Sequence, residues 1–483
     1  MNAIWQYNRK RFSRPPLNKN IKADVAVIGG GLTGILTADA LIAEGKRVVV
    51  LDTSVIGSGQ TGKTTAKVTS QHGDIYHKLE HSFGSSAAAQ YAQANQRALS
   101  AYRQLIRMRH IRCDWEDTDA CLYSTESSEP LTEEARAQQR AGLDAKYCAK
   151  HDLPFSVKGV VRLSGQGQFH PLKFLYALAE DLRIYENTQI RAVESDRIET
   201  DSGSVTAEQI IFTCHFPFIN WPGGYFLRMH QERSYVLALT GTPKLSAHYF
   251  SVDSGGLSLR QAGDYLLLGG GSHRTGENCS DPYESLRRSA SLLFPESCEA
   301  AHWSAQDCMT LDGIPYIGHF SSATPNWYVA TGFGKWGMSS AMVSALLLRD
   351  SILGRDAAWG SIFSPLRITP APSAASFLDE GVHAVRGLSR RLFSNAHSAA
   401  QTLPPAHGGV VELDGQKIGL YRSSEGEVWM VDIRCPHLGC QLSWNQAEAS
   451  WDCPCHGSRF NYRGQPMDGP AQTKLTARRL PKV

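Results

Sequence analysis

The sequence predicts an α/β body built on a parallel sheet, followed by a small all-β domain. Near the N-terminus, an apolar strand, a glycine-rich turn, a helix and a second apolar strand follow one another within residues 21–51. This βαβ order requires a parallel sheet. From Gly408 onward, short strands alternate with turns, which is typical of an all-β domain. The length of 483 residues is enough for about two to four domains.

The composition excludes several classes of protein. Hydrophobic residues make up 42% of the chain and charged residues 20%, and the formal net charge is +3. These values are ordinary for a globular protein and give no reason to expect nucleic acid as a partner. The apolar runs are the length of strands, so we expect no transmembrane segment. The basic N-terminus has no apolar stretch typical of a secretory signal, and we therefore expect a cytoplasmic protein.

Changes in composition divide the chain into three parts. Residues 1–350 form the α/β body. Residues 351–400 are rich in Pro, Ser, Ala and Gly and are predicted to be a connector, with an amphipathic helix over Ala375–Asn395. Residues 401–483 form the all-β domain.

The glycine-rich turn has the spacing of a dinucleotide-binding site. Gly29, Gly31 and Gly34 follow the first strand and open a helix, and Asp52 ends the next strand. Such glycines let the backbone approach a pyrophosphate, and the helix N-terminus stabilises its negative charge. Asp52 is placed to accept a hydrogen bond from the adenosine ribose.

Residues 22–350 resemble the D-amino-acid-oxidase-like flavoproteins, the group of glycine oxidase and sarcosine oxidase. Five segments match this family in the right order: Ile56–Thr65 (IGSGQTGKTT), Phe169–Leu182, Ile210–Thr213, Thr310–Gly318 (TLDGIPYIG) and Thr331–Gly337 (TGFGKWG). The resemblance implies FAD as the cofactor, a Rossmann-like domain of the glutathione-reductase type and an inserted α+β substrate domain. The residues expected to bind FAD are Gly29, Gly31, Gly34, Asp52, Thr64, Thr65, Gly332, Gly334, Lys335 and Gly337.

The candidates for catalysis are few, because a flavin takes the hydride itself and the protein orients the substrate. Lys335 lies in the flavin-binding turn, where it would stabilise negative charge on reduced flavin; alternatively, it faces solvent or the pyrophosphate. Arg274 is a candidate to hold a substrate carboxylate, and Tyr235 lies on a strand that often faces substrate in this family. The stretch Lys63–Lys67 (KTTAK) departs from the oxidases, which usually have small residues with Arg or His there.

Two short segments near the C-terminal end carry a metal-binding pattern. CPHLGC occupies residues 435–440, and CPCHGSRF occupies residues 453–460. The pattern C-x-H and C-x-x-H suits a 2Fe–2S cluster in which two thiolates hold one iron and two imidazoles hold the other. A zinc site also uses Cys and His at short spacings. A zinc site has no need of the extra cysteines Cys440 and Cys455, so they favour the cluster.

Residues 405–483 resemble the Rieske proteins, specifically the disulfide-containing class. The resemblance implies that the cluster ligands are Cys435, His437, Cys453 and His456. It also implies a disulfide between Cys440 and Cys455, a hydrogen bond from Ser458 to a cluster sulfur, and an exposed histidine edge. The high-potential members have Tyr where this chain has Phe460, so we expect a lower potential here.

These features together predict a flavin-dependent dehydrogenase. It would oxidise a C–N bond of an amine or amino-acid-like substrate by hydride transfer to FAD. The electrons would then pass one at a time to the Rieske cluster and on to an acceptor protein or a quinone. The alternative is an electron-transfer protein that exchanges electrons with a protein partner and oxidises no small substrate.

Overall fold

A parallel sheet forms the dinucleotide-binding part of the computed structural model, which describes residues 3–6, 13–277, 281–355, 357–367, 403–413 and 416–480. The sheet runs in the order β16-β17-β10-β1-β2-β7, with β9 beside β10 and β8 beside β9. β1 pairs in parallel with β2 and β10, and β17 pairs in parallel with β10. The strands are β1 (Ile21–Ile28), β2 (Val48–Leu51), β7 (Ile184–Tyr185), β8 (Ile190–Glu194), β9 (Arg197–Thr200), β10 (Ser204–Phe212), β16 (Tyr316–Ser321) and β17 (Thr324–Thr331).

Both faces of this sheet are covered. Val25 and Val27 of β1 belong to the hydrophobic core on the helical side, whereas Ala26 and Ile28 belong to a second core that includes residues of β8 and β9. Burial on both faces explains why β1 and β2 are nearly continuous apolar runs. The helices of the chain are α1 (Leu32–Ile42), α2 (Ile75–Phe83), α3 (Ser85–Met108), α4 (Glu129–Arg140), α5 (Pro171–Leu178), α6 (Pro282–Leu293) and α7 (Gly337–Ile352), with the 3-10 turns η1 (Ile4–Gln6), η2 (Gln60–Gly62), η3 (Tyr225–Leu227) and η4 (Ala358–Phe363).

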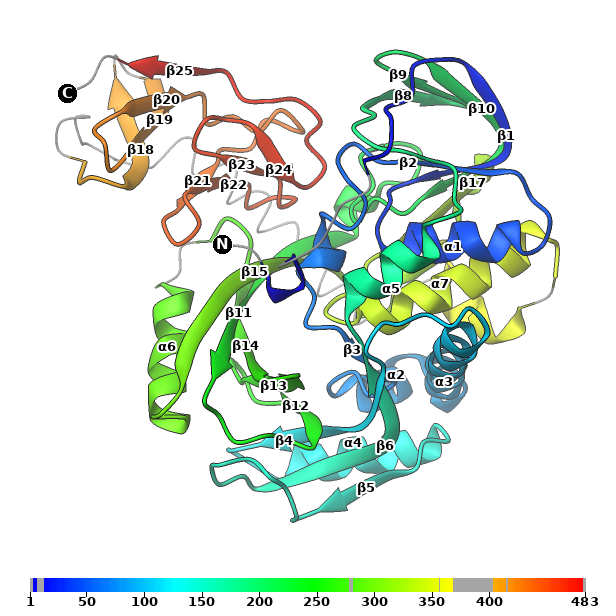
Figure 1. The fold of residues 1–483 in the computed structure, drawn as a ribbon, viewed down its shortest axis with the longest axis vertical. Helices are drawn as coiled ribbons and strands as arrows, with labels where there is room; N and C mark the ends of the chain where they lie inside the picture. The colour runs from blue at the N-terminus through cyan, green and yellow to red at the C-terminus, as the bar shows by residue number, and fades with distance from the viewer. Residues whose placement is uncertain are drawn as a thin grey trace.

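A second, mixed sheet forms the inserted lobe below the first (Figure 1). Its order is β15-β11-β14-β13-β12-β4-β6-β3, with β5 beside β6. The long strands β11 and β15 reach up to the cofactor part, and α6 packs on β14 and β11. The strands are β3 (Lys67–Val68), β4 (Glu116–Ser124), β5 (Ala145–Cys148), β6 (Gly159–Gln168), β11 (Met229–Thr240), β12 (Ala247–Ser251), β13 (Ser258–Ala262), β14 (Tyr265–Arg274) and β15 (Cys298–Thr310).

The C-terminal domain consists of two small antiparallel sheets. Its inner sheet lies beside β11 and β15, and its outer sheet points away from the body (Figure 1). The inner strands are β21 (Ser443–Asn445), β22 (Ser450–Asp452), β23 (Arg459–Asn461) and β24 (Pro466–Asp468); the outer strands are β18 (His407–Leu413), β19 (Gln416–Arg422), β20 (Val428–Val431) and β25 (Ala477–Leu480). The helix expected over Ala375–Asn395 lies outside the described residues.

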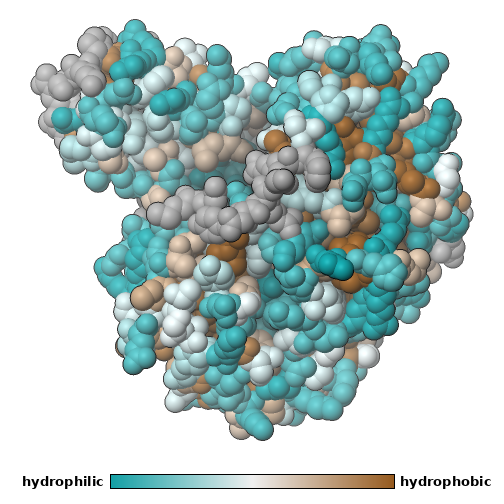
Figure 2. Space-filling model, in the orientation of Figure 1, coloured by the Kyte–Doolittle hydropathy of each residue, from teal (hydrophilic) through white to brown (hydrophobic). Residues whose placement is uncertain are grey.

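The surface in the same orientation is mostly hydrophilic. Figure 2 shows hydrophobic residues gathered over the dinucleotide-binding part, in the region of α1 and α5. Among the described helices, none combines the length and the apolar character needed to cross a membrane.

Candidate functional site

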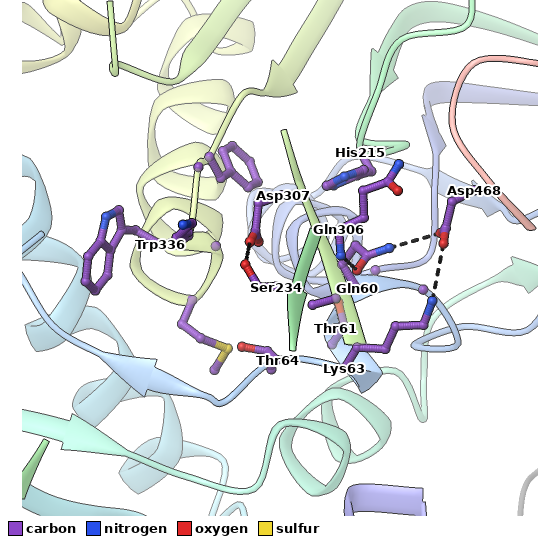
Figure 3. Close-up of a pocket in the computed structure, with 18 of the residues that line it drawn as sticks. Gln60, Thr61, Lys63, Thr64, His215, Ser234, Gln306, Asp307, Trp336 and Asp468 are labelled. Atoms are coloured by element: carbon purple, nitrogen blue, oxygen red, sulfur yellow. Dashed lines mark hydrogen bonds and ion pairs between the residues drawn. The ribbon is translucent and has the colours of Figure 1, made fainter. Parts of the chain in front are cut away.

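A cavity of about 770 Å³ lies where the parallel sheet, the inserted lobe and the C-terminal domain meet. Figure 3 shows side chains of η2, β11, β15 and the turn before α7 around it. Residues Met467, Asp468, Gly469 and Gln472 of the C-terminal domain line the same cavity. The cavity is therefore shared between the body and the C-terminal domain.

The glycine-rich turn after β1 forms one end of this cavity. Gly29 has a φ of +111°, and a Cβ there would lie 2.7 Å from the carbonyl oxygen of Thr213. A Cβ on Gly34 would lie only 1.9 Å from the carbonyl oxygen of Gly29, so this glycine is needed for close packing of α1 on the turn. Gly31 itself lines the cavity at the N-terminus of α1. Its position suits a pyrophosphate.

Asp52 lines the cavity at the end of β2. Its carboxylate accepts backbone hydrogen bonds from Gly30 and Ser54, each at 2.7 Å. Burial raises the pKa of Asp52, and these two hydrogen bonds oppose that rise. The carboxylate is held against the turn, where it could also accept a hydrogen bond from a ribose hydroxyl.

A second helix N-terminus opens on the cavity at α7. Gly334, Lys335 and Gly337 line the cavity, whereas Gly332 does not. Gly332 has a φ of +74°, and a Cβ there would lie 2.3 Å from Cγ2 of Thr310, so it shapes the turn from behind. Two helix N-termini that face one cavity, with an acid at the end of β2, fit a dinucleotide such as FAD.

Thr64 and Thr65 line the cavity on the loop between η2 and β3. The indole of Trp5 donates a hydrogen bond of 2.7 Å to the carbonyl oxygen of Thr64. The indole of Trp303 donates one of 2.8 Å to the carbonyl oxygen of Lys63. The loop is thus held in place from two directions. A fixed loop of this kind suits a wall that contacts a flat ring such as the isoalloxazine of FAD.

Of the three catalytic candidates, Lys335 and Tyr235 reach the cavity. The Lys335 ammonium lies 3.2 Å from Oε2 of Glu232. A hydrogen bond from His230, together with the charge of Lys335, lowers the pKa of Glu232 to about 2. Tyr235 is fully buried, and its ring stacks on His273 with centroids 5.6 Å apart.

Arg274 does not line the cavity. Its Nε donates a hydrogen bond of 3.4 Å to the carbonyl oxygen of Pro454, in the second cysteine loop of the C-terminal domain. The structure therefore places this arginine at the contact between the two domains, away from the position expected for a residue that holds a substrate carboxylate.

The structure places further charged residues in the cavity that were not among the candidates, and two of them have shifted pKa values. Lys67 belongs to the KTTAK stretch, and its ammonium donates to the hydroxyls of Thr65 and Ser258, both at 3.3 Å. Burial and the nearby charge of Arg260 lower the pKa of Lys67 to about 7. In the sequence, the unusual KTTAK stretch is the feature that could have pointed to Lys67.

Asp307 on β15 also lines the cavity and accepts a hydrogen bond of 2.7 Å from Ser234 (Figure 3). Burial raises the pKa of Asp307 to about 6. Nothing in the local sequence marks this residue, because its place in the cavity depends on the pairing of β15 with β11.

The two cysteine loops of the C-terminal domain lie side by side, joined by a disulfide between Cys440 and Cys455. The sulfur of Cys453 lies within 4.8 Å of both disulfide sulfurs, but those two have no thiolate to offer a metal. Cys435 and Cys453 are the buried cysteines left free in these loops. Hydrogen bonds from Cys435 N to Cys440 O and from Cys453 N to Ser458 O, both 2.8 Å, shape the two loops.

The two histidines of these loops lie close together, with ring centroids 4.9 Å apart. The Nδ1 atom of His437 is buried and has no hydrogen-bond partner within the described part of the chain. A buried imidazole nitrogen without a partner is a suitable metal ligand. Two free thiols, two imidazoles and a disulfide between the loops fit a Rieske cluster. Ser458, the residue expected to form a hydrogen bond with a cluster sulfur, is fully buried. Its hydroxyl accepts a hydrogen bond of 3.2 Å from Ala471 N.

The expectation that the histidine edge is exposed was wrong for His456, whereas His437 is half-buried. His456 is buried, and its ring lies 5.7 Å from that of Phe226 in the body. Nε2 of His437 lies 2.6 Å from Oδ1 of Asn220, also in the body. The side chain of Gln231 donates a hydrogen bond of 2.7 Å to the backbone carbonyl of His456. The histidine edge therefore faces the flavoprotein-like body.

Buried polar contacts attach the C-terminal domain to the body. The Arg233 side chain is fully buried, and its Nε lies 3.0 Å from Glu448. Glu448 also accepts a hydrogen bond of 2.7 Å from Arg459. Burial alone would favour the neutral acid, but Arg459 and Arg233 lower the pKa of Glu448 to about 2. Such a buried pair is costly to break.

A second set of contacts joins η2 to the C-terminal domain at the cavity. Asp468 accepts a hydrogen bond of 3.0 Å from Gln60 and lies 3.4 Å from the ammonium of Lys63, as Figure 3 shows. Lys63 lies within the KTTAK stretch. The departure of this stretch from the oxidases therefore has a structural counterpart in the contact with the added domain.

Comparisons with known proteins match both parts. A family model described as FAD dependent oxidoreductase (DAO) matches residues 24–351, and one described as Rieske [2Fe-2S] domain matches residues 396–480. The Rieske 2Fe-2S iron-sulfur protein YhfW of Bacillus subtilis is 36% identical over 97% of this chain and 96% of its own length. Gamma-glutamylputrescine oxidoreductase of Escherichia coli is 26% identical over 74% of this chain and 89% of its own length. Glycine oxidase from Geobacillus kaustophilus has a similar fold, with a TM-score of 0.61 and 20% identity over 72% of this chain and 99% of its own.

Proposed function

Since the chain belongs to the FAD-dependent oxidoreductase (DAO) family and carries a Rieske [2Fe-2S] domain, with FAD and a Rieske cluster as its cofactors, we propose that it is a dehydrogenase acting on the C–N bond of an amine or amino-acid-like substrate. Bound FAD would accept a hydride from the substrate, and the cluster would pass single electrons to an external protein or quinone. The proposed FAD-binding and cluster-binding residues are those described above.

One observation carries this proposal: the C-terminal domain lines the cofactor cavity. Asp468 and Gly469 lie in its wall, and Asp468 is tied to Gln60 and Lys63 on the other side. An oxidase that used oxygen directly would have no need of such an attached cluster. A cluster domain that closes the cavity favours a route for electrons from that cavity to the cluster.

The side chains of the inserted lobe support a C–N donor that carries a negative charge. The Lys67 ammonium faces hydroxyl groups and, in the described part of the chain, pairs with no carboxylate. An anionic group of a substrate would stabilise the charged form of Lys67, so this side chain is a candidate to bind such a group. Tyr235 and Phe250 also line the cavity and would exclude water from the substrate. Relatives named glycine oxidase and gamma-glutamylputrescine oxidoreductase support the same class of donor.

The experiment mixes oxygen-free protein, loaded with both cofactors, with amino acids, their decarboxylated amines and NAD(P)H, and in separate samples with a ferredoxin or a reductase. Flavin bleaching reports oxidation of the substrate, and the electron-spin resonance signal of the reduced cluster reports electron transfer. We expect an amino-acid-like compound to bleach the flavin and to produce the cluster signal. If only a reductase or a ferredoxin reduces the flavin, the protein is an electron-transfer protein and the dehydrogenase proposal is wrong.

A further inference from the structure

The segment 213–227 connects the cofactor cavity directly to the cluster ligands. It leaves the C-terminal end of β10, and its first residues, including His215 and Phe216, line the cavity. Its later residues Asn220 and Phe226 contact His437 and His456. Figure 3 shows His215 on the side of the cavity where Asp468 lies.

This segment is held firmly, unlike an ordinary surface loop. Phe216 and Tyr225 are buried in the core beneath the parallel sheet, and the Tyr225 hydroxyl donates a hydrogen bond of 2.8 Å to Phe320 O. Within the segment, Gly224 N donates one of 2.9 Å to Asn220 O. Asn220 is thus the first residue of a fixed turn, and its side chain has a defined direction.

The contact between Asn220 and His437 has one chemically consistent orientation. If Nδ1 of His437 binds iron, its Nε2 carries the proton and acts as the donor. Oδ1 of Asn220, 2.6 Å away, then accepts that hydrogen bond. Phe226 packs its ring against both histidines, at 6.2 Å from His437 and 5.7 Å from His456. The body therefore supplies one polar contact and one apolar contact to the same edge.

We propose that segment 213–227 is a built-in receptor for the histidine edge of the cluster, and that Asn220 is a positioning residue that sets the cluster's reduction potential. An acceptor on the imidazole N–H makes the ring a stronger donor to iron, which stabilises the oxidised cluster. Loss of this acceptor should therefore make the cluster easier to reduce. The inference rests on the proposed cluster ligands and is independent of the substrate.

The test is a redox titration of the full holoprotein, reduced by dithionite and followed by electron-spin resonance. At a fixed solution potential, Asn220→Leu should raise the ratio of reduced to oxidised cluster about tenfold, which corresponds to 59 mV for one electron. Asn220→Asp keeps an acceptor and adds negative charge, so its ratio should fall below that of the wild type. Asn326→Leu, on β17 and hydrogen-bonded to Ser195 O instead, is the matched control and should leave the ratio unchanged.

An Asn220→Leu protein that has a normal cluster spectrum and the wild-type ratio would overturn the proposal. If Asn220→Leu does not assemble a cluster, Asn220→Asp decides: an unchanged or raised ratio in that variant also overturns the proposal. Because dithionite replaces the substrate, failure of the dehydrogenase proposal would not affect this test.

Discussion

The two redox sites of this protein are built in opposite ways. The proposed cluster ligands lie between Cys435 and His456, on two loops joined by a disulfide. The cofactor cavity is lined by residues from Ile28 to Gln472, taken from the parallel-sheet part, the inserted lobe and the C-terminal domain. The difference teaches that the cluster site is a local unit, whereas the cavity depends on how the parts are assembled. A substitution inside one site that leaves the contact between the domains unchanged should therefore leave the other site intact.

The largest expected effect is complete loss of the cluster in His456→Ala. The reason is that one iron loses one of its two imidazole ligands. Electron-spin resonance of the reduced protein should show no Rieske signal, while the flavin absorbance remains. His407→Ala changes an exposed histidine on β18 of the same domain and should keep the signal. A normal Rieske spectrum in His456→Ala would show that the ligand assignment is wrong.

The reverse experiment removes FAD and keeps the cluster. In Gly34→Ala, the new methyl group meets the carbonyl oxygen of Gly29, so the turn must move away from the pyrophosphate position. We expect the dissociation constant of FAD to rise at least about tenfold, which corresponds to a loss of roughly 1.4 kcal/mol or more of binding energy. The cluster signal should persist. A dissociation constant for FAD equal to that of the wild type would contradict the proposed pyrophosphate site.

A smaller effect is expected where the two parts are joined. Arg233→Met leaves Glu448 buried with one cation fewer, and we expect a loss on the order of 3 kcal/mol in the free energy of unfolding, measured by denaturant titration. The matched control is Arg479→Met, which breaks an exposed ion pair with Glu427 on the outer sheet. That change should cost about 1 kcal/mol or less. Equal losses in the two variants would refute a special role for the buried pair.

The smallest effect concerns the pH dependence of that contact. The pKa of Glu448 is about 2 in the folded protein, below its ordinary value of 4.5. Its stabilising contribution is therefore present above pH 4.5 and is lost as the pH falls toward 2. The melting temperature of the wild type should exceed that of Glu448→Gln most clearly near neutral pH, and the gap should narrow between about pH 4.5 and 3. A gap that widens on acidification would contradict this assignment.

The sequence predicted the local features well. Gly29, Gly31 and Asp52 lie together at the cavity because the βαβ unit pairs β2 with β1 and so brings the end of β2 beside the turn after β1. The two cysteine and histidine loops are near each other in the sequence and are joined by the disulfide between Cys440 and Cys455. By contrast, Asp307 enters the cavity only through the pairing of β15 with β11, and Arg274 is drawn to the domain contact. Such positions depend on tertiary packing, which no local pattern encodes.

The contact between the domains was the part least accessible from the sequence. The resemblance to the Rieske proteins implied an exposed histidine edge, but here Asn220 and Phe226 contact that edge and His456 is buried. Asn220 is separated from His437 by 217 residues, and a lone Asn in a loop carries no recognisable signal. The unusual Lys63 was visible in the sequence, but its partner Asp468 was not.

The central claim is that electrons pass from the cofactor cavity to the cluster within one chain. The direct test is light-driven reduction of the flavin in oxygen-free protein, with the rise of the cluster's electron-spin resonance signal followed at protein concentrations that differ about tenfold. The account predicts that the cluster is reduced with the same rate constant at every concentration. A rate proportional to protein concentration, or a cluster that stays oxidised, would contradict it.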